Sequence, residues 1–250
     1  MRVLFLRIID ILLSLTILLI TTPFLTISLL IVYLNDFKNP FYVSERVGKN
    51  FRIFKIFKIR TMIKNADKYK IDSTSENDFR ITKVGKLIRK YKLDEFLQFF
   101  NVLIGNMSIV GPRPNVIREV NLYTEEEKFL LSKNPGITDP SSIIFSDLSQ
   151  ILSNYDDPDI AYNQLVRPWK SRISIFYLKK GNVISDLIII ALTFLSIFSR
   201  KLSLLFISKL LERLGASNDI VNISIRNKKL IPTIPPGGNT VVKSRDIKGK

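Results

Sequence analysis

The chain has 250 residues, enough for one domain with a substantial core. It is basic and apolar at once, with a formal net charge of +16 and 46% hydrophobic residues. Nucleic-acid-binding proteins are usually basic and polar, so this pairing favours an anionic membrane surface. A nucleic-acid binder is the weaker alternative, and we expect no nucleic-acid partner. Because the sequence contains no Cys and no His, disulfides, thiol nucleophiles and Ser-His-Asp chemistry are excluded. A bound metal would need oxygen ligands, which indicates Mg²⁺ or Mn²⁺.

Residues 11–34 carry no charge. As a helix, this segment would be about 36 Å long, enough to cross a hydrocarbon core of about 30 Å. Pro23 follows Thr22 near its middle, and proline removes a backbone donor and bends helices. Both flanks are basic, and basic flanks favour the cytoplasm. The pattern predicts a re-entrant membrane helix over residues 1–36 that is broken at Pro23; a kinked single crossing is the alternative.

The next predicted elements are short. Residues 51–60 mix aromatic and β-branched side chains, which favours a strand, although basic residues at every third position also fit a surface helix. Thr82 is a candidate N-cap for a helix over residues 83–90. Apolar side chains then recur at helical spacing, so we predict a further helix over residues 93–104.

Beyond this point turns and caps organise the chain. Residues 111–114 read Gly-Pro-Arg-Pro, which indicates a stiff turn. Thr124 begins a capping-box pattern that predicts a short helix. Residues 159–167 have a helical pattern, and we expect Pro168 to end that helix.

A second apolar run covers residues 183–198. Its uncharged part is short for a crossing and has basic residues at both ends, so it predicts an interfacial amphipathic helix or a core helix. The expected fold is α+β and mostly helical. The predicted organisation is a re-entrant membrane helix over 1–36, a small cytoplasmic catalytic domain with interfacial helices over 37–215, and a polar, flexible tail over 216–250.

The most suggestive stretch for chemistry contains the adjacent carboxylates Asp94 and Glu95. Six basic residues and no acidic residue lie from Arg80 to Lys92. A helix N-terminus and nearby cations both lower the pKa of a carboxyl group. An ionised Asp94 could then attack phosphorus and form an acyl phosphate, while Glu95 could hold Mg²⁺. The alternative is structural, because Asp and Glu are common in a first helical turn.

Arg113 is the second candidate site residue. The prolines on either side restrict the backbone and fix the direction of the guanidinium group, which suits bidentate phosphate recognition. A solvated arginine in a structural turn is the alternative. Lys58 and Arg60 could also reach a phosphate, or they could lie on lipid headgroups.

These motifs together resemble the bacterial sugar transferase family, the monotopic polyprenol-phosphate phosphoglycosyl transferases that start glycan assembly. The resemblance runs from about Arg7 to Arg200. Many matching blocks in the same order make chance implausible. The blocks are residues 7–10, Pro23, 46–48, 54–62, 77–85, 93–95, Gln98, 101–103, 105–114 and 135–138.

The resemblance implies an enzyme of the bacterial cytoplasmic membrane, with its catalytic domain on the cytoplasmic face. It implies that Asp94 attacks the β-phosphate of a UDP-sugar, releases UMP and passes the phosphosugar to undecaprenyl phosphate, while Glu95 carries Mg²⁺. Membrane lipids and other glycan-assembly enzymes are further candidate partners. The candidate substrate-binding cations are Lys58, Arg60, Arg80, Arg89 and Arg113.

The chain also departs from the family pattern. Residues 96–98 read Phe-Leu-Gln where the family often has Leu-Pro-Gln, and residues 139–143 replace a common Gly-Trp-Ala-Gln block. The second departure leaves the identity of the sugar open. A catalytically silent, basic membrane scaffold is the alternative function, but the intact Asp94, Glu95 and Arg113 favour an enzyme.

Overall fold

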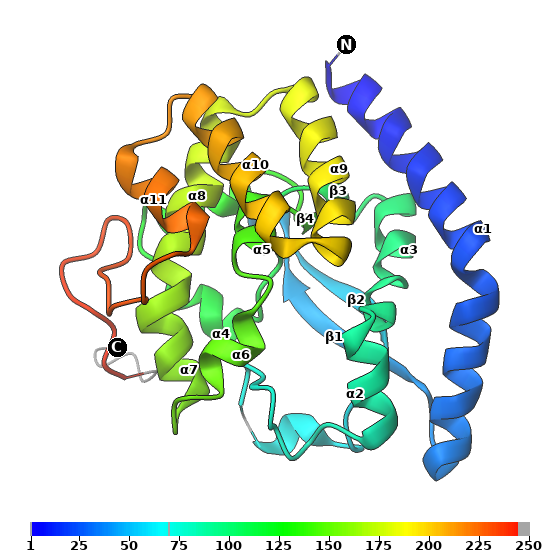
Figure 1. The fold of residues 1–250 in the computed structure, drawn as a ribbon. Helices are drawn as coiled ribbons and strands as arrows, with labels where there is room; N and C mark the ends of the chain where they lie inside the picture. The colour runs from blue at the N-terminus through cyan, green and yellow to red at the C-terminus, as the bar shows by residue number, and fades with distance from the viewer. Residues whose placement is uncertain (1, 70, 245–250) are drawn as a thin grey trace.

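The computed structural model describes residues 2–69 and 71–244. Figure 1 shows a mostly helical body with the long helix α1 (Arg2–Asp36) along one side. The described residues also form two two-stranded sheets. In chain order the α-helices and strands after α1 are β1 (Phe41–Val47), β2 (Ile53–Ile59), α2 (Lys83–Lys90), α3 (Gln98–Leu103), β3 (Ser108–Val110), α4 (Ile117–Val120), β4 (Gly136–Thr138), α5 (Pro140–Ile144), α6 (Leu148–Leu152), α7 (Pro158–Ala161), α8 (Arg167–Lys180), α9 (Val183–Phe198), α10 (Arg200–Arg213) and α11 (Asn218–Ile225).

Helix α1 continues through Pro23 without interruption. The break predicted at this position is therefore not observed. The hydroxyl groups before the proline bond back to the preceding turn: Thr21 and Thr22 donate to the carbonyls of Ile17 and Leu18 at 2.7 and 2.6 Å. The re-entrant path itself stays a prediction.

One stripe of α1 packs on the body, and the opposite face is exposed. Leu18, Leu25 and Val32 are buried in a core shared with α2, α3 and β2. The other side presents large apolar side chains, among them Leu19 and Phe24. By length and composition, α1 is long and apolar enough to cross a membrane. The helix therefore joins the protein core on one side and offers an apolar surface on the other.

Both ends of α1 are tied to the same body. Near the first end, Arg7 donates to two carbonyls at the end of α3, at 2.6 and 2.8 Å, and Asp10 accepts the backbone N–H of Ile109 in β3 at 3.1 Å. At the other end, Asp36 forms an ion pair with Arg60 at 2.6 Å. A helix fixed at both ends to one body lies along that body.

Two local predictions are confirmed next to α1. The segment predicted as strand or surface helix is strand β2, which pairs antiparallel with β1 from Phe41 opposite Ile59 to Val47 opposite Ile53. The predicted cap at Thr82 is also present, since its hydroxyl accepts the backbone N–H of Gly85 at 2.9 Å and α2 follows. Capping satisfies one of the free donors of the first helical turn.

Two predictions about helix ends gave different results. Thr124 forms the predicted reciprocal capping box with Glu127, with both bonds at 3.1 Å, and a 3₁₀ helix follows over Glu127–Ser132. Pro168, however, does not end a helix: a turn of π-helix leads into α8, and Pro168 lies in the first turn of α8. The prediction was wrong because proline is tolerated in a first turn, where its missing donor is not needed.

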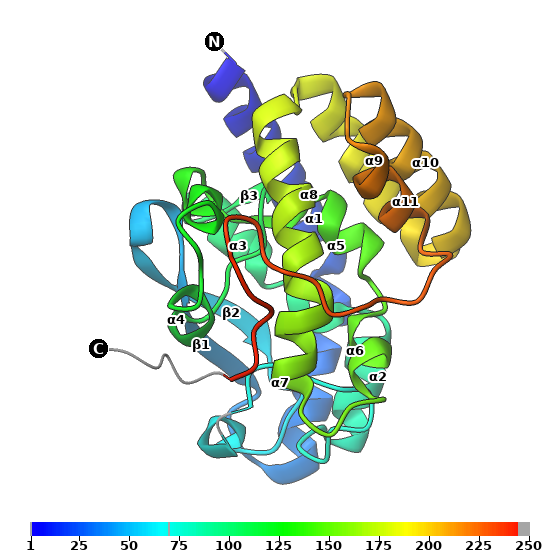
Figure 2. The same ribbon diagram turned by 90° about the vertical axis from the view of Figure 1, so that its left-hand side faces the viewer.

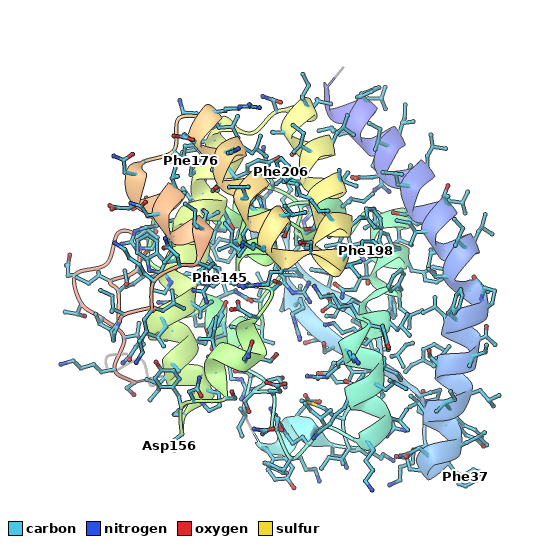
Figure 3. The ribbon with its side chains drawn as sticks, viewed as in Figure 1. Phe37, Phe145, Asp156, Phe176, Phe198 and Phe206 are labelled. Carbon is cyan, nitrogen blue, oxygen red and sulfur yellow. The ribbon has the colours of Figure 1, made fainter. Side chains whose placement is uncertain are left out.

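Helix α9 confirms that residues 183–198 are helical, and its apolar side chains are divided between core and surface. Ile189 and Leu192 are buried against the helices around α8 and α10. Phe198, at the end of α9, is 87% exposed and lies on the surface beside α10 (Figure 3). That division suits an amphipathic helix, and its place at a membrane interface stays a prediction.

The segment after residue 216 differs from the predicted flexible tail. Helix α11 packs against α10 and α8, and Ile220 and Leu230 are buried in the same core. The chain then crosses α8 (Figure 2), where Arg172 donates to the carbonyl of Ile234 at 2.6 Å. The polar composition concealed a few apolar anchors, so residues 216–244 belong to the body.

Strands β3 and β4 pair in parallel, and Gly136 of β4 lies against Gly111, which follows β3 next to the turn that carries Arg113. A Cβ atom on Gly136 would lie 2.1 Å from the backbone nitrogen of Gly111. We expect Gly136→Ala to lower the free energy of unfolding by about 3 kcal/mol, because two backbones would have to separate. Gly215→Ala is the control, since its site is open and only its positive φ of 84° matters, at about 1 kcal/mol. Equal losses by thermal unfolding in detergent would contradict this account.

Candidate active site

Asp94 and Glu95 lie in a 3₁₀ turn over Leu93–Glu95, between α2 and α3. The turn follows Lys92, whose φ of 55° is left-handed and ends the path of α2. We had predicted one continuous helix from residue 93, with both carboxylates in its first turn. Apolar residues three apart fit a 3₁₀ turn as well as an α-helix, so the sequence pattern did not separate the two.

Glu95 is the anchor for two cations that come from different parts of the chain. Lys58 on β2 donates to Glu95 Oε1 at 3.0 Å, and Arg113, from the turn after β3, donates to the same oxygen. Burial alone would raise the pKa of Glu95, but the charges of Arg113 and Lys58 and their hydrogen bonds outweigh it. The pKa of Glu95 is therefore far below its usual value, and the side chain is ionised.

The pKa of Asp94 is shifted in the direction opposite to that of Glu95. Only 8% of the residue is exposed, and burial raises the pKa of its carboxyl group, although the charges of Lys58, Arg89 and Arg113 act against this; the charge of Glu95 raises it further. The sequence-based expectation of a lowered pKa was therefore wrong for Asp94. The sequence shows the cations but not the burial, nor that Glu95 holds two of them.

Arg89 lies beside the carboxylates but bonds to neither. Its Nε donates to Thr61 Oγ1 at 2.8 Å, and its charge interacts most strongly with Asp94. Burial lowers the pKa of the Arg89 guanidinium, and the carboxylates partly offset that effect. Arg89 is therefore a cation close to the candidate nucleophile whose remaining guanidinium nitrogens can meet a bound anion.

The structure does not bring Arg60 and Arg80 to this cluster. Arg60 makes two bonds of 2.6 Å to Asp36, at the end of α1, and Arg80 is held by Asp78 at 2.6 Å and by the carbonyl of Ile71 at 2.8 Å. Both guanidinium groups are buried and hold chain segments together. Bidentate carboxylate partners already occupy both groups, and their contact with substrate stays a prediction.

Two further residues contribute to this region, although the sequence analysis did not assign them to the site. Asn101 is buried on α3; its amide accepts from the backbone N–H of Phe57 at 3.2 Å and donates to the carbonyl of Lys55 at 2.7 Å. It thereby fixes the distance between α3 and the strand that carries Lys58. Lys170 on α8 lines a pocket with Arg113. Among so many lysines, nothing in the sequence singles it out.

The cluster has the composition of a phosphate-binding site. Two adjacent carboxylates and the cations Lys58, Arg89 and Arg113 lie together between α2, β2 and the turn after β3. Among the described residues, no group of three or more acidic side chains could enclose a metal. Mg²⁺ usually takes one or two carboxylates and completes its shell with water and substrate phosphates. The Asp94–Glu95 pair fits that mode of binding.

A model of the family described as bacterial sugar transferase matches residues 1–200, which include every residue of this cluster. The chain belongs to the bacterial sugar transferase family. The resemblance inferred from the sequence motifs is thereby confirmed. Lys58, Asp94, Glu95, Arg113 and Lys170 of this sugar transferase all lie inside the matched region.

Several relatives are similar to part of this sugar transferase. An Aeromonas hydrophila UDP-N-acetylgalactosamine-undecaprenyl-phosphate N-acetylgalactosaminephosphotransferase is 39% identical over 106 residues, 41% of this chain and 25% of the relative. A Klebsiella pneumoniae UDP-glucose:undecaprenyl-phosphate glucose-1-phosphate transferase is 35% identical over 137 residues, which cover 54% of this chain and 30% of the relative. The exopolysaccharide production protein ExoY of Sinorhizobium fredii is 34% identical over 144 residues, which cover 52% of this chain and 64% of the relative. The chain thus spans less than two thirds of the length of each.

Proposed function

We propose that this sugar transferase moves a sugar 1-phosphate from a UDP-sugar to undecaprenyl phosphate, as the first step of exopolysaccharide, capsule or lipopolysaccharide synthesis. The buried carboxylate Asp94, next to the Glu95–Lys58–Arg113 contacts, carries the proposal. The names of the relatives supply the substrate classes. A silent scaffold would have no need to keep a costly buried carboxylate among cations, so the enzyme is favoured.

The proposed reaction has two displacements at one phosphorus atom. In the first, a carboxylate oxygen of Asp94 bonds to the β-phosphorus, and the bond to the oxygen bridging to the α-phosphate breaks, so that UMP leaves with the electron pair. In the second, a phosphate oxygen of undecaprenyl phosphate attacks the same phosphorus and frees Asp94. Lys58, Arg89 and Arg113 offset the charge of the phosphates. The burial of Asp94 limits water, which would otherwise hydrolyse the acyl phosphate.

Glu95 is the residue that would hold Mg²⁺, with Asp94 beside it. When bound, Mg²⁺ neutralises the charge of the diphosphate. Because one oxygen of Glu95 already accepts from Lys58 and Arg113, at least one of these cations is expected to turn toward the substrate phosphates during binding. Ion pairs of this kind keep cations positioned until an anion arrives.

The lipid substrate requires the reacting groups to sit near a membrane surface. We propose that the exposed apolar faces of α1 and α9 lie in the cytoplasmic leaflet of the cytoplasmic membrane, with both ends of α1 on the cytoplasmic side. The contacts of Arg7 and Asp36 with one body support this topology over a simple crossing. The proposed re-entrant path would then require α1 to bend in the bilayer at Pro23, where the backbone lacks a donor.

The function is tested by incubating the purified protein in detergent with undecaprenyl phosphate, Mg²⁺ and a panel of UDP-sugars. We expect one UDP-sugar to yield UMP and a lipid-linked sugar diphosphate in equal amounts, and chelation of Mg²⁺ to stop the reaction. Folded protein that releases no UMP from any UDP-sugar would contradict the enzyme and favour the scaffold.

A further inference from the structure

Arg113 also lines a pocket that contains a further cation, Lys170. The pocket is formed between the turn after β3 and α8, and its lining includes Arg113, Lys170 and the serines Ser141, Ser171 and Ser174. Arg113 connects the two regions, since it contacts Glu95 and also lines this pocket. A ligand that begins at the carboxylate pair can therefore continue past Arg113 toward Lys170.

Within the described part of the chain, no hydrogen bond or ion pair joins the ammonium group of Lys170 to another residue. The carboxylate whose charge acts most strongly on Lys170 is Asp139, and its oxygens are already engaged. Asp139 accepts from Ser141 at 2.9 Å, from Ser142 at 2.7 Å and from Ser174 at 2.5 Å. This network holds the hydroxyls in place and leaves Lys170 as a cation without a bonded anion.

We propose that Lys170 binds the α-phosphate of the nucleotide sugar, the phosphate that leaves with UMP, while Arg113 bridges to the β-phosphate beside Asp94. The proposal rests on the proposed function and extends it to the leaving group. Two adjacent phosphates need cations at two adjacent places, and the structure offers Arg113 and Lys170 in one pocket. Lysine suits this role, since its ammonium group acts as a compact point charge on phosphate.

The electrostatics of the pocket are consistent with an anionic ligand. Burial lowers the pKa of Lys170 to about 8; the charge of Asp139 opposes this, Arg113 adds to it, and Glu95 opposes it. A bound phosphate would favour the protonated amine. Below about pH 8 the cation is present, and as the pH rises through 8 it is lost. Since UMP is already a dianion above about pH 6, its affinity should fall between pH 7 and pH 9.

The test compares Lys170→Met with Lys170→Arg by calorimetric binding of UMP to the full chain in detergent with Mg²⁺. We expect Lys170→Met to weaken UMP binding about 10- to 100-fold, the effect of one charged hydrogen bond. Lys170→Arg should restore most of the affinity and remove its decline between pH 7 and pH 9. Lys180→Met is the matched control, the same substitution at an exposed position of the same helix.

Each result separates this inference from the proposed function. If Lys170→Met is folded and binds UMP as tightly as the unaltered protein, with the same KM for the UDP-sugar, the assignment of Lys170 is overturned and the transferase stands. If both variants unfold at lower temperature and arginine restores nothing, Lys170 is structural and the inference also fails. If the unaltered protein binds UMP through Lys170 but transfers no sugar phosphate, the proposed function fails and the phosphate site stands.

Discussion

Asp94→Asn is expected to abolish UMP release, by about 10⁴-fold or more, while the protein stays folded and binds UMP. The amide has the shape of the carboxylate but no anionic oxygen to bond to phosphorus. Stability should change little. Because burial raises the pKa of Asp94, folding disfavours its charged form, and a neutral isostere removes a desolvation cost rather than a favourable contact. The loss of activity is measured by UMP release, the retained binding by UMP titration, and the stability by thermal unfolding.

The control is Asp156→Asn, the same substitution in the loop after α6, where the side chain is exposed at the lower edge of the view in Figure 3. It should keep full activity. In the unaltered protein, reactions with UDP-sugar and Mg²⁺ but without undecaprenyl phosphate should be quenched with acid and digested. They should yield a peptide that carries a phosphosugar on Asp94. Appreciable turnover by Asp94→Asn, or product formation without that adduct, would show that another group attacks phosphorus.

Local structure followed from the sequence wherever one local interaction decides it. Thr82 caps α2 because a hydroxyl in that position satisfies a free N–H, whatever else the chain does. β-Branched residues at 53, 56 and 59 favour β2 for similarly local reasons. The two prolines were harder, since their effect depends on context. Pro168 is harmless in a first turn, and α1 continues through Pro23 although the backbone lacks a donor there.

The candidate site was predictable in part. Motifs identified Asp94, Glu95, Lys58 and Arg113, and the structure brings these four together. The same motifs did not distinguish them from arginines that hold the fold. Whether a guanidinium meets substrate or a carboxylate such as Asp36 is decided by tertiary contacts 24 residues apart in sequence.

Burial was the other missing quantity. It reverses the pKa shift expected for Asp94, and it makes Lys170 different from the other lysines of a strongly basic chain. Neither effect has a local sequence signature, because the elements that cover these side chains come from distant parts of the chain. Residue type and spacing located the chemistry, and the fold determined the protonation state of its groups.

Glu95→Gln should impair both stability and catalysis, unlike Asp94→Asn. The pKa of Glu95 is lowered in the folded state, so its charge stabilises the protein above the usual carboxyl pKa, and this contribution is lost as the pH falls through the lowered value. At pH 7 the amide leaves Lys58 and Arg113 facing each other without an anion. We expect a loss of about 1–3 kcal/mol, since the three side chains are partly exposed, and a kcat lowered about 10²- to 10³-fold.

Glu125→Gln gives the matched comparison, because its carboxylate also pairs with a lysine but is 89% exposed. An exposed ion pair contributes little, so this variant should stay within about 0.5 kcal/mol of the unaltered protein with full activity. The proposed Mg²⁺ role adds a separate readout: residual Glu95→Gln activity should need more Mg²⁺ for half-saturation. Unaltered stability would contradict the ion-pair account, and an unaltered Mg²⁺ requirement would contradict metal binding by Glu95, so the two roles of this carboxylate are tested independently.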